Sequence, residues 1–223
     1  MIGTKVLEEK SSKFNGNIRV VRTLGMGTYI QAEGLTQSGG IVESIWRKTL
    51  KYLNNKKIFK ESEPPKPLTV NNCLILGLGG GTVAGLIRKN WPGARLTGIE
   101  IDPVMIELGK KYLDLDRLKI DIKVHDADSF IKIKNGSPDT KYDLIIVDLY
   151  RGDKFPEKFG TEDYLGFIKN KLSESGVAVF NRLYYGDKRP ETVKFGRELE
   201  KIFSKVIWFY PEANLMFLCS KRE

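Results

Sequence analysis

Gly77, Gly79 and Gly81 follow an apolar run, and Glu100 stands near the end of the next apolar run, residues 96–101. Glycines at this spacing let a chain leave a strand in a tight turn, bring its backbone against a ligand and begin a helix whose N-terminal amides face that ligand. An acid at the end of the following strand accepts hydrogen bonds from ribose hydroxyls. The pattern therefore predicts a nucleotide-binding βαβ unit, although glycines alone are also typical of plain turns.

The elements that must position these residues alternate along the rest of the chain. Five apolar runs are typical of buried parallel strands, and helical segments lie between them. A short turn at residues 211–214 joins two further strands, which must therefore pair antiparallel. The predicted fold is α/β, a doubly wound and mostly parallel sheet of seven strands with an antiparallel C-terminal hairpin. Its strands are expected at residues 73–76, 96–101, 120–124, 144–148, 177–181, 206–210 and 215–220.

The region before the glycines carries a different pattern. Residues 18–22 and 28–32 are short β-type runs, which predict a small N-terminal hairpin, and apolar residues recur at helical spacing over residues 41–53. Prolines at positions 64, 65 and 67 prevent that helix from continuing. We therefore predict three parts, which are an N-terminal β-hairpin region with a helix (1–55), a connector (56–70) and a Rossmann-like cofactor-binding domain (71–223).

Composition limits the chemistry open to the chain. Its 223 residues suffice for one sizeable domain, and Cys73 and Cys219 lie inside apolar runs, as buried thiols do. With His125 as the one histidine no metal site is expected, and no apolar run has the length of a membrane span, so a cytoplasmic protein without a membrane partner is predicted. The net charge of +9 suits a nucleic acid or an acidic protein. A nucleic-acid partner is not favoured, because the lysines alternate with acids as on solvated helix faces.

Several segments together resemble S-adenosylmethionine-dependent transferases of the class I methyltransferase fold. Thr82 stands where a dinucleotide fingerprint has its third glycine, which argues against a nicotinamide cofactor. The closer resemblance is to the spermidine synthase family. It is carried by the glycine loop and by residues 34–37, 100–103, 126–127, 142–148 and 172–177. The resemblance implies S-adenosylmethionine or its decarboxylated form as cofactor, no metal, and a homodimer formed through the N-terminal β-region.

The resemblance also implies roles in the cofactor site. Glu100 corresponds to the acid that holds the ribose, Asp126 to the acceptor of the adenine amino group, and the glycine loop to the backbone under the amino-acid tail and sulfur. Asp126 has an alternative role as the cap of a helix beginning near Ser129, and Asp148 one as a turn residue. The residues assigned to the cofactor are Gly77, Gly79, Gly81, Glu100, Ile101, Asp126, Ala127 and Asp148.

The catalytic half departs from the spermidine synthase pattern. Those enzymes carry an acid in the glycine loop that binds the aminopropyl amine, where this chain has Gly80. Their Asp-x-x-Asp motif has a second acid that deprotonates the attacking amine. Here the motif reads Asp148-Leu149-Tyr150-Arg151, and arginine keeps its proton with a pKa above about 12. The helix segment that faces the polyamine reads Trp46-Arg47-Lys48. Cationic and aromatic groups are therefore expected in place of the polyamine pocket.

The leading prediction is therefore a methyltransferase that uses intact S-adenosylmethionine on an unidentified small-molecule or protein acceptor. Methyl transfer from a sulfonium needs mainly proximity and desolvation, so a missing base is tolerable when the acceptor is already nucleophilic. Arg151 either holds a carboxylate or phosphate of the substrate or lies in a surface loop. The residues assigned to catalysis are Asp148, Tyr150, Arg151 and Asp153, with Gln37, Trp46 and Tyr184 as walls of the substrate site.

Two other functions stay open from the sequence. An aminopropyltransferase would use decarboxylated S-adenosylmethionine, with Asp153 replacing the displaced base. A non-catalytic scaffold would bind a nucleoside without turnover. We also expect Glu100→Ala to leave folding intact while weakening nucleoside binding, because a ribose ligand at a strand end stabilises the empty protein little.

Overall fold

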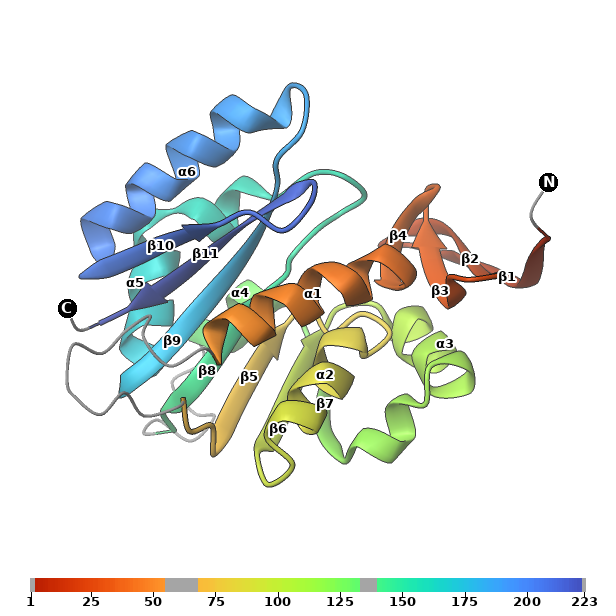
Figure 1. Ribbon diagram of the computed structural model, residues 1–223, viewed down its shortest axis with the longest axis horizontal. Coiled ribbons are helices and arrows are strands. Elements are labelled where there is room, and N and C mark those ends of the chain that lie inside the picture. Colours follow the sequence, from red (N-terminus) through yellow and green to blue (C-terminus); the bar gives the residue numbers. More distant parts are fainter. Residues whose placement is uncertain (1–2, 55–67, 133–139, 222–223) are drawn as a thin grey trace.

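The computed structural model describes residues 3–54, 68–132 and 140–221, which form two sheets with their helices (Figure 1). A seven-stranded sheet carries most of the helices, and a four-stranded sheet stands at one end of the molecule. Residues 56–67 of the predicted connector lie outside the described residues. Across the described ranges, no helix is long and apolar enough to cross a membrane.

The seven-stranded sheet has the predicted doubly wound topology. Strands β5 to β9 run parallel, and β11 pairs antiparallel with both β9 and β10. The strand order is β10-β11-β9-β8-β5-β6-β7, so the α/β fold with an antiparallel C-terminal hairpin is confirmed. The strands are β5 (Asn72–Leu76), β6 (Arg95–Glu100), β7 (Ile120–Val124), β8 (Tyr142–Val147), β9 (Leu172–Leu183), β10 (Lys205–Phe209) and β11 (Asn214–Ser220).

Helices cover both faces of this sheet, because its strands send apolar side chains alternately to each side. Cys73 and Ile75 of β5 pack with α1 and α2, whereas Leu74 and Leu76 pack with α4, α5 and α6. All four side chains are fully buried, as expected for a parallel strand covered on both faces. The helices are α1 (Gly40–Leu53), α2 (Thr82–Asn90), α3 (Pro103–Tyr112), α4 (Ala127–Lys132), α5 (Glu162–Lys171) and α6 (Lys188–Ile202), with short 3₁₀ helices η1 (Leu115–Leu118) and η2 (Glu157–Gly160).

The N-terminal region is larger than the predicted hairpin. It is a four-stranded antiparallel meander in which the two predicted strands, β2 and β3, lie between β1 and β4. The sequence did not reveal β1 and β4, because β1 has only two apolar residues, which are adjacent, and β4 is short and mostly polar. Neither strand therefore shows apolar alternation. The inner face of the meander packs Ile18, Val20 and Ile30 against Met105 and Leu108 of α3. The strands are β1 (Thr4–Ser12), β2 (Gly16–Thr23), β3 (Gly27–Ala32) and β4 (Leu35–Gly39).

Local signals in the sequence are visible at the start of α3 and in the cysteines. The Asp102 carboxylate caps α3 by accepting a hydrogen bond from the Val104 amide at 2.9 Å, and Pro103 begins the helix. Cys73 and Cys219 are free thiols in the interior, and burial raises the pKa of both. Both cysteines therefore act as small apolar residues of the core.

Two side-chain hydrogen bonds join the N-terminal sheet to the glycine loop. Ser38 Oγ accepts from the Gly80 amide at 2.7 Å, and Thr82 Oγ1 accepts from the Gly39 amide at 2.7 Å. Ser38 is 2% exposed, so solvent has little access to replace its oxygen. The N-terminal sheet therefore positions the loop that the sequence assigns to the cofactor.

Ser38→Ala is expected to lower the free energy of unfolding by about 1–3 kcal/mol, because the buried Gly80 amide loses its acceptor. Chemical denaturation of both proteins measures the difference. Ser11→Ala is the matched control, since Ser11 is exposed on β1, and should change stability by less than about 0.5 kcal/mol. Equal stability of Ser38→Ala and the unaltered protein would contradict this role.

Candidate functional site

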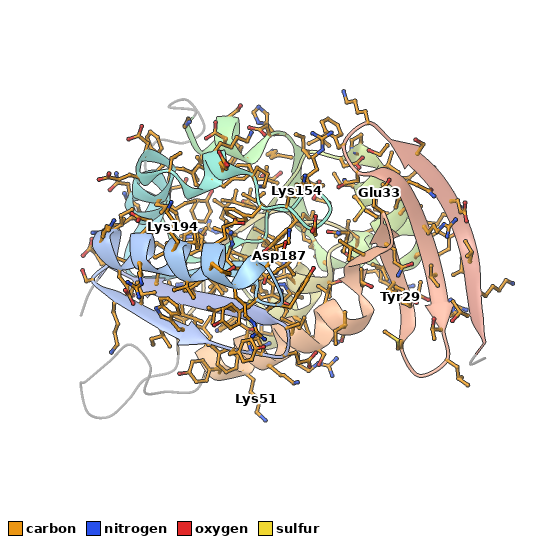
Figure 2. The ribbon with its side chains drawn as sticks, turned by 90° about the horizontal axis from the view of Figure 1, so that it is seen from above. Tyr29, Glu33, Lys51, Lys154, Asp187 and Lys194 are labelled. Carbon is orange, nitrogen blue, oxygen red and sulfur yellow. The ribbon has the colours of Figure 1, made fainter. Side chains whose placement is uncertain are left out.

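A cavity of about 920 Å³ opens at the carboxyl ends of the central strands. It lies where the strand order reverses between β5 and β8, the place at which doubly wound sheets bind ligands. Its walls come from the turn after β1, from β4 and the start of α1, and from the loops that follow the parallel strands. Figure 2 shows the segment with Lys154 and the turn with Asp187 between the N-terminal sheet, labelled at Tyr29 and Glu33, and helix α6, labelled at Lys194.

The glycine loop is held by contacts that only bare backbone permits. Gly77 has a φ of +86°, and a Cβ atom there would lie 2.0 Å from the carbonyl oxygen of Asp148. The amides of Gly77 and Leu78 both donate to the carbonyl of Ile99 at 3.0 Å. Gly81, with a φ of +93°, is the N-cap of α2. The chain therefore leaves β5, turns and begins α2 at the glycines, as their spacing predicts.

Glu100 ends β6 and holds this loop. Its Oε2 accepts from the Gly79 amide at 2.8 Å, and its Oε1 accepts from the Asp102 amide at 3.0 Å. The side chain is 8% exposed. Burial raises the pKa of this carboxyl group, and the two amide hydrogen bonds oppose the rise. Because Glu100 supports the empty loop, we expect Glu100→Ala to destabilise the protein, contrary to the expectation from the sequence.

Asp126 caps a helix in this structure. Its Oδ1 accepts from the Ser129 amide at 3.0 Å, and α4 begins at Ala127, slightly before the predicted start. Lys158 of η2 donates to Oδ2 at 2.7 Å. Partial burial raises the pKa of Asp126, but the hydrogen bonds from Lys158 and Ser129 outweigh it and hold the pKa below its usual value. An adenine amino group at Asp126 must therefore share the carboxylate with Lys158 or displace this ammonium.

Asp148 follows β8 and lines the cavity. Trp46 Nε1 donates to its Oδ2 at 2.9 Å, and Asn181 Nδ2 donates to its Oδ1 at 2.8 Å. Burial raises the pKa of Asp148, while the hydrogen bonds from Asn181 and Trp46 lower it in part. A carboxylate with a raised pKa in a cavity has the properties of a general base.

The remaining predicted residues divide between the cavity and its surroundings. Trp46 is fully buried and reaches the cavity only through its hydrogen bond to Asp148. Gly81 lies at the start of α2 against Leu115. The predicted residues that line the cavity are Gln37, Gly77, Gly79, Glu100, Ile101, Asp126, Ala127, Asp148, Tyr150 and Arg151.

Two predicted residues stand apart from Asp148. Asp153 forms an ion pair with Lys188 at 2.8 Å, which lowers the pKa of Asp153, and it lines a neighbouring cavity. Tyr184 packs edge-on against Tyr210 and lies under the guanidinium of Arg189. The structure therefore does not bring these two side chains into the lining of the main cavity.

The sequence did not reveal two asparagines of the site, Asn181 and Asn214, which also line the cavity. Asn181 ends the predicted strand 177–181, and a polar residue at the carboxyl end of an apolar strand was a usable signal. Asn214 was placed in the terminal turn, whereas it is the first residue of β11. No local pattern marks it, because its partner, Asn181, lies on another strand.

Fold and cavity together define the class of this protein. A seven-stranded sheet in this order, with a glycine loop after β5 and an acid at the end of β6, is the class I methyltransferase fold. The model of the spermine/spermidine synthase domain family matches residues 63–210, more than half of the chain. The chain belongs to this family.

Relatives of this chain transfer either aminopropyl or methyl groups. A polyamine aminopropyltransferase of Vibrio vulnificus is 36% identical over 118 residues, 52% of this chain and 38% of that protein. An N-terminal histidine N-methyltransferase of Emericella nidulans is 32% identical over 168 residues, 70% of this chain and 29% of that protein. The spermidine synthase of Thermotoga maritima has the same fold, with a TM-score of 0.71 at 18% identity over 97% of this chain and 73% of that one. The chain thus spans well under half the length of the first two relatives.

Glu100→Gln is expected to weaken binding of methylthioadenosine by about 1.5–3 kcal/mol, the contribution of a hydrogen bond to a charged group. Glutamine keeps an oxygen for one of the two amides, so the loop retains part of its support. Calorimetric titration measures the affinity, and thermal unfolding measures the loss of stability. Glu162→Gln, at an exposed position of α5, is the control. Unchanged affinity in Glu100→Gln would place the nucleoside elsewhere.

Proposed function

We propose that this chain is an S-adenosylmethionine-dependent methyltransferase that acts on an amine of a protein. The observation that carries the proposal is the acceptor end of the cavity. Arg151 lines the cavity where the second acid of the polyamine-synthesising motif would stand, and Gly80 replaces the acid of the glycine loop. Family membership and the two relatives support a transferase of the S-adenosylmethionine class.

Gly80, which stands where spermidine synthases carry an acid, packs closely against side chains that would have to shift to admit a larger residue. A Cβ atom on Gly80 would lie 2.8 Å from both Ile30 Cδ1 and Leu113 Cδ1, and 3.1 Å from Ser38 Cβ. These side chains come from the N-terminal sheet and from the residue that ends α3. The loop therefore offers no carboxylate to the aminopropyl amine of decarboxylated S-adenosylmethionine. Without that charge interaction, the loop does not favour the decarboxylated form over the intact one.

Arg151 brings a positive charge to the wall of the cavity. Its backbone pairs with Lys154 across a tight turn, through hydrogen bonds of 2.9 and 3.1 Å. Within the part of the chain that the structure describes, its guanidinium forms no ion pair. An unpaired guanidinium attracts a carboxylate and repels a polyamine. The carboxylate that intact S-adenosylmethionine has, and the decarboxylated form lacks, is a suitable partner.

When bound, S-adenosylmethionine supplies a methyl group on a sulfonium that is open to in-line attack. The residues of the chain have to orient the acceptor amine, exclude water and accept the amine's proton. Asp148, Glu100 and Asp126 all line the cavity, and the proposal assigns Asp148 to the acceptor and the other two acids to the nucleoside. The raised pKa of Asp148 suits it to take that proton. Burial raises the pKa of the Tyr150 hydroxyl, so this group stays protonated and does not serve as the base.

The opening of the cavity favours a protein segment over a polyamine. Leu35, Ile41 and Tyr185 line the cavity and are 38%, 44% and 38% exposed. Apolar groups at the opening bury the side chain of a peptide but give no partner to the second ammonium of a polyamine. The relative from Emericella nidulans, whose name gives an N-terminal histidine as acceptor, supports the same class of acceptor.

Aminopropyl transfer is the second candidate, favoured by the similarity to the Vibrio vulnificus enzyme. That reaction needs a base in place of the second acid of the motif, and Asp153 is the nearest acid that follows Arg151. Asp153 is paired with Lys188 and lines the neighbouring cavity. A base in that place does not reach an amine beside Asp148, which favours the methyl reaction.

The purified chain is expected to transfer a radiolabelled methyl group from S-adenosylmethionine to a peptide amine. It should release no methylthioadenosine from decarboxylated S-adenosylmethionine and putrescine. Calorimetric titration should show tighter binding of the intact form, and Arg151→Ala should remove that preference, because the carboxylate loses its cation. Rapid release of methylthioadenosine, with tighter binding of the decarboxylated form, would refute methyl transfer.

Asp148→Asn is expected to lower kcat/KM for methyl transfer by about 10²–10⁴-fold, because an amide cannot accept the proton of the amine. Initial rates over a range of peptide concentrations measure this ratio. Asp163→Asn, at an exposed position of α5, is the control and should leave the ratio unchanged. If Asp148→Asn has unaltered kcat/KM, Asp148 takes no part in the reaction.

A further inference from the structure

A chain of buried hydrogen bonds runs through the site from α1 to β11. Trp46 Nε1 donates to Asp148 Oδ2 at 2.9 Å, and Asn181 Nδ2 donates to Asp148 Oδ1 at 2.8 Å. Asn214 Nδ2 in turn donates to Asn181 Oδ1 at 2.7 Å. Asn181 and Asn214 are 7% and 6% exposed, so little solvent reaches them to take over these bonds.

The donor and acceptor groups of the four side chains determine the direction of each hydrogen bond in this series. An indole N–H is a donor only, so Asp148 Oδ2 has to accept. An amide side chain has a donor end and an acceptor end. Because the Asn214 amide occupies the oxygen of Asn181, Asn181 turns its NH₂ group toward Asp148. In the opposite orientation the oxygen of Asn181 would face an oxygen of the carboxylate, and the two would repel.

Resting on the proposed function, we propose that Asn214 is a positioning residue, which acts through Asn181 to keep Asp148 as a hydrogen-bond-accepting carboxylate that can receive the proton of the acceptor amine. Asn214 makes no bond to Asp148 itself. Its effect passes through the orientation of one amide. The proposal extends the catalytic machinery to the antiparallel strand β11, which lies far from Asp148 in the sequence.

Asp148 accepts its side-chain hydrogen bonds from neutral groups within the described residues. Its neighbours Trp46 on α1, Asn181 on β9 and Asn214 on β11 are all neutral, and Tyr150 on its own loop stays protonated. The same cavity is also lined by the charged or titratable residues Lys13, Glu100, His125, Asp126, Arg151 and Lys158. Arg182 of β9 pairs with Glu191 of α6, and Glu212 of the turn before β11 pairs with Lys48 of α1. Burial has the largest effect on the pKa of Asp148 and raises it, and the hydrogen bonds from Asn181 and Trp46 have the next largest effect and lower it.

Two substitutions of Asn214 test this role. Asn214→Leu removes the donor at similar size, so the orientation of Asn181 is held by Asp148 alone and its hydrogen bond to Asp148 is weakened. Asn214→Asp reverses the preferred direction of the hydrogen bond between positions 181 and 214. A carboxylate at position 214 attracts the NH₂ group of Asn181, which turns the amide oxygen of Asn181 toward Asp148. Each change weakens the hydrogen bond that the Asp148 carboxylate accepts from Asn181 and so raises the pKa of Asp148. In Asn214→Asp the added negative charge raises this pKa further. The acid limb of the pH profile of kcat/KM, which reports the base of the free enzyme, should therefore move to higher pH.

We expect the limb to move by about half to one pH unit in Asn214→Leu and further in Asn214→Asp, since one pKa unit corresponds to about one hydrogen bond. Well above the limb, kcat should approach that of the unaltered enzyme. Thr49→Val is the matched control, because it removes another buried hydrogen bond of α1, from Thr49 Oγ1 to the Ile45 carbonyl at 2.8 Å, away from the cavity. The acid limb of the pH profile of Thr49→Val should not move. An unmoved limb in both folded Asn214 variants would overturn the proposal.

A second measurement needs no activity. The indole N–H of Trp46 donates to Asp148, so its nuclear magnetic resonance signal should titrate with this carboxyl group. Trp46→Phe assigns the signal among the three tryptophans. Its midpoint should rise in Asn214→Leu and Asn214→Asp and stay in place in Thr49→Val, whereas an equal midpoint in all these proteins would overturn the positioning role. Absence of methyl transfer to any amine refutes the proposed function alone, since the indole titration still decides the role of Asn214.

Discussion

Close contact between the glycine loop and its neighbours is the constraint on which this site depends. A Cβ atom on Gly77 would overlap the carbonyl oxygen of Asp148, and one on Gly80 would overlap side chains of the N-terminal sheet and the end of α3. Because bare backbone alone fits, the loop approaches the end of β8 on one side and the N-terminal sheet on the other. Ser38 and Thr82 then tie the two sheets together at this loop. The glycine loop, where the two sheets are in contact, therefore also forms a wall of the cavity.

The acids around this joint are stabilised by neutral donors. Glu100 accepts from two backbone amides, and Asp148 accepts from an indole and an amide side chain. Asp102, fully buried, accepts from Ser12, Asn15 and the first turn of α3. Neutral donors satisfy a carboxylate without cancelling its charge, so Glu100 and Asp148 keep their capacity for a further partner. A cavity with such acids suits a ligand that carries a sulfonium or an ammonium.

The residues around Asp148 differ from the polyamine-synthesising pattern of the family. Gly80, packed against Ile30 and Leu113, stands in place of one acid of the polyamine-synthesising pattern, and Arg151 stands in place of the other. Asp153 is two residues from Arg151 in the sequence, yet the tight turn between Arg151 and Lys154 leaves it in the neighbouring cavity, paired with a lysine. Asp148, Arg151 and the apolar side chains of Leu35, Ile41 and Tyr185 all line the cavity, and this combination supports the proposal of an amine within a larger molecule.

The sequence by itself determined the central sheet, the glycine turn, the cap of α3 and the acids that end β6 and β8, because each is a local pattern of strand, turn or helix start. The charged β1 and the short β4 have no such pattern and were missed. Tertiary structure decided the acceptor end. Trp46, Asp148, Asn181 and Asn214 come from α1, the end of β8, β9 and β11, and their hydrogen bonds form only when those segments pack. The periodicity of a helix or strand indicates which of its faces is buried. It does not indicate which distant side chain each buried residue will contact.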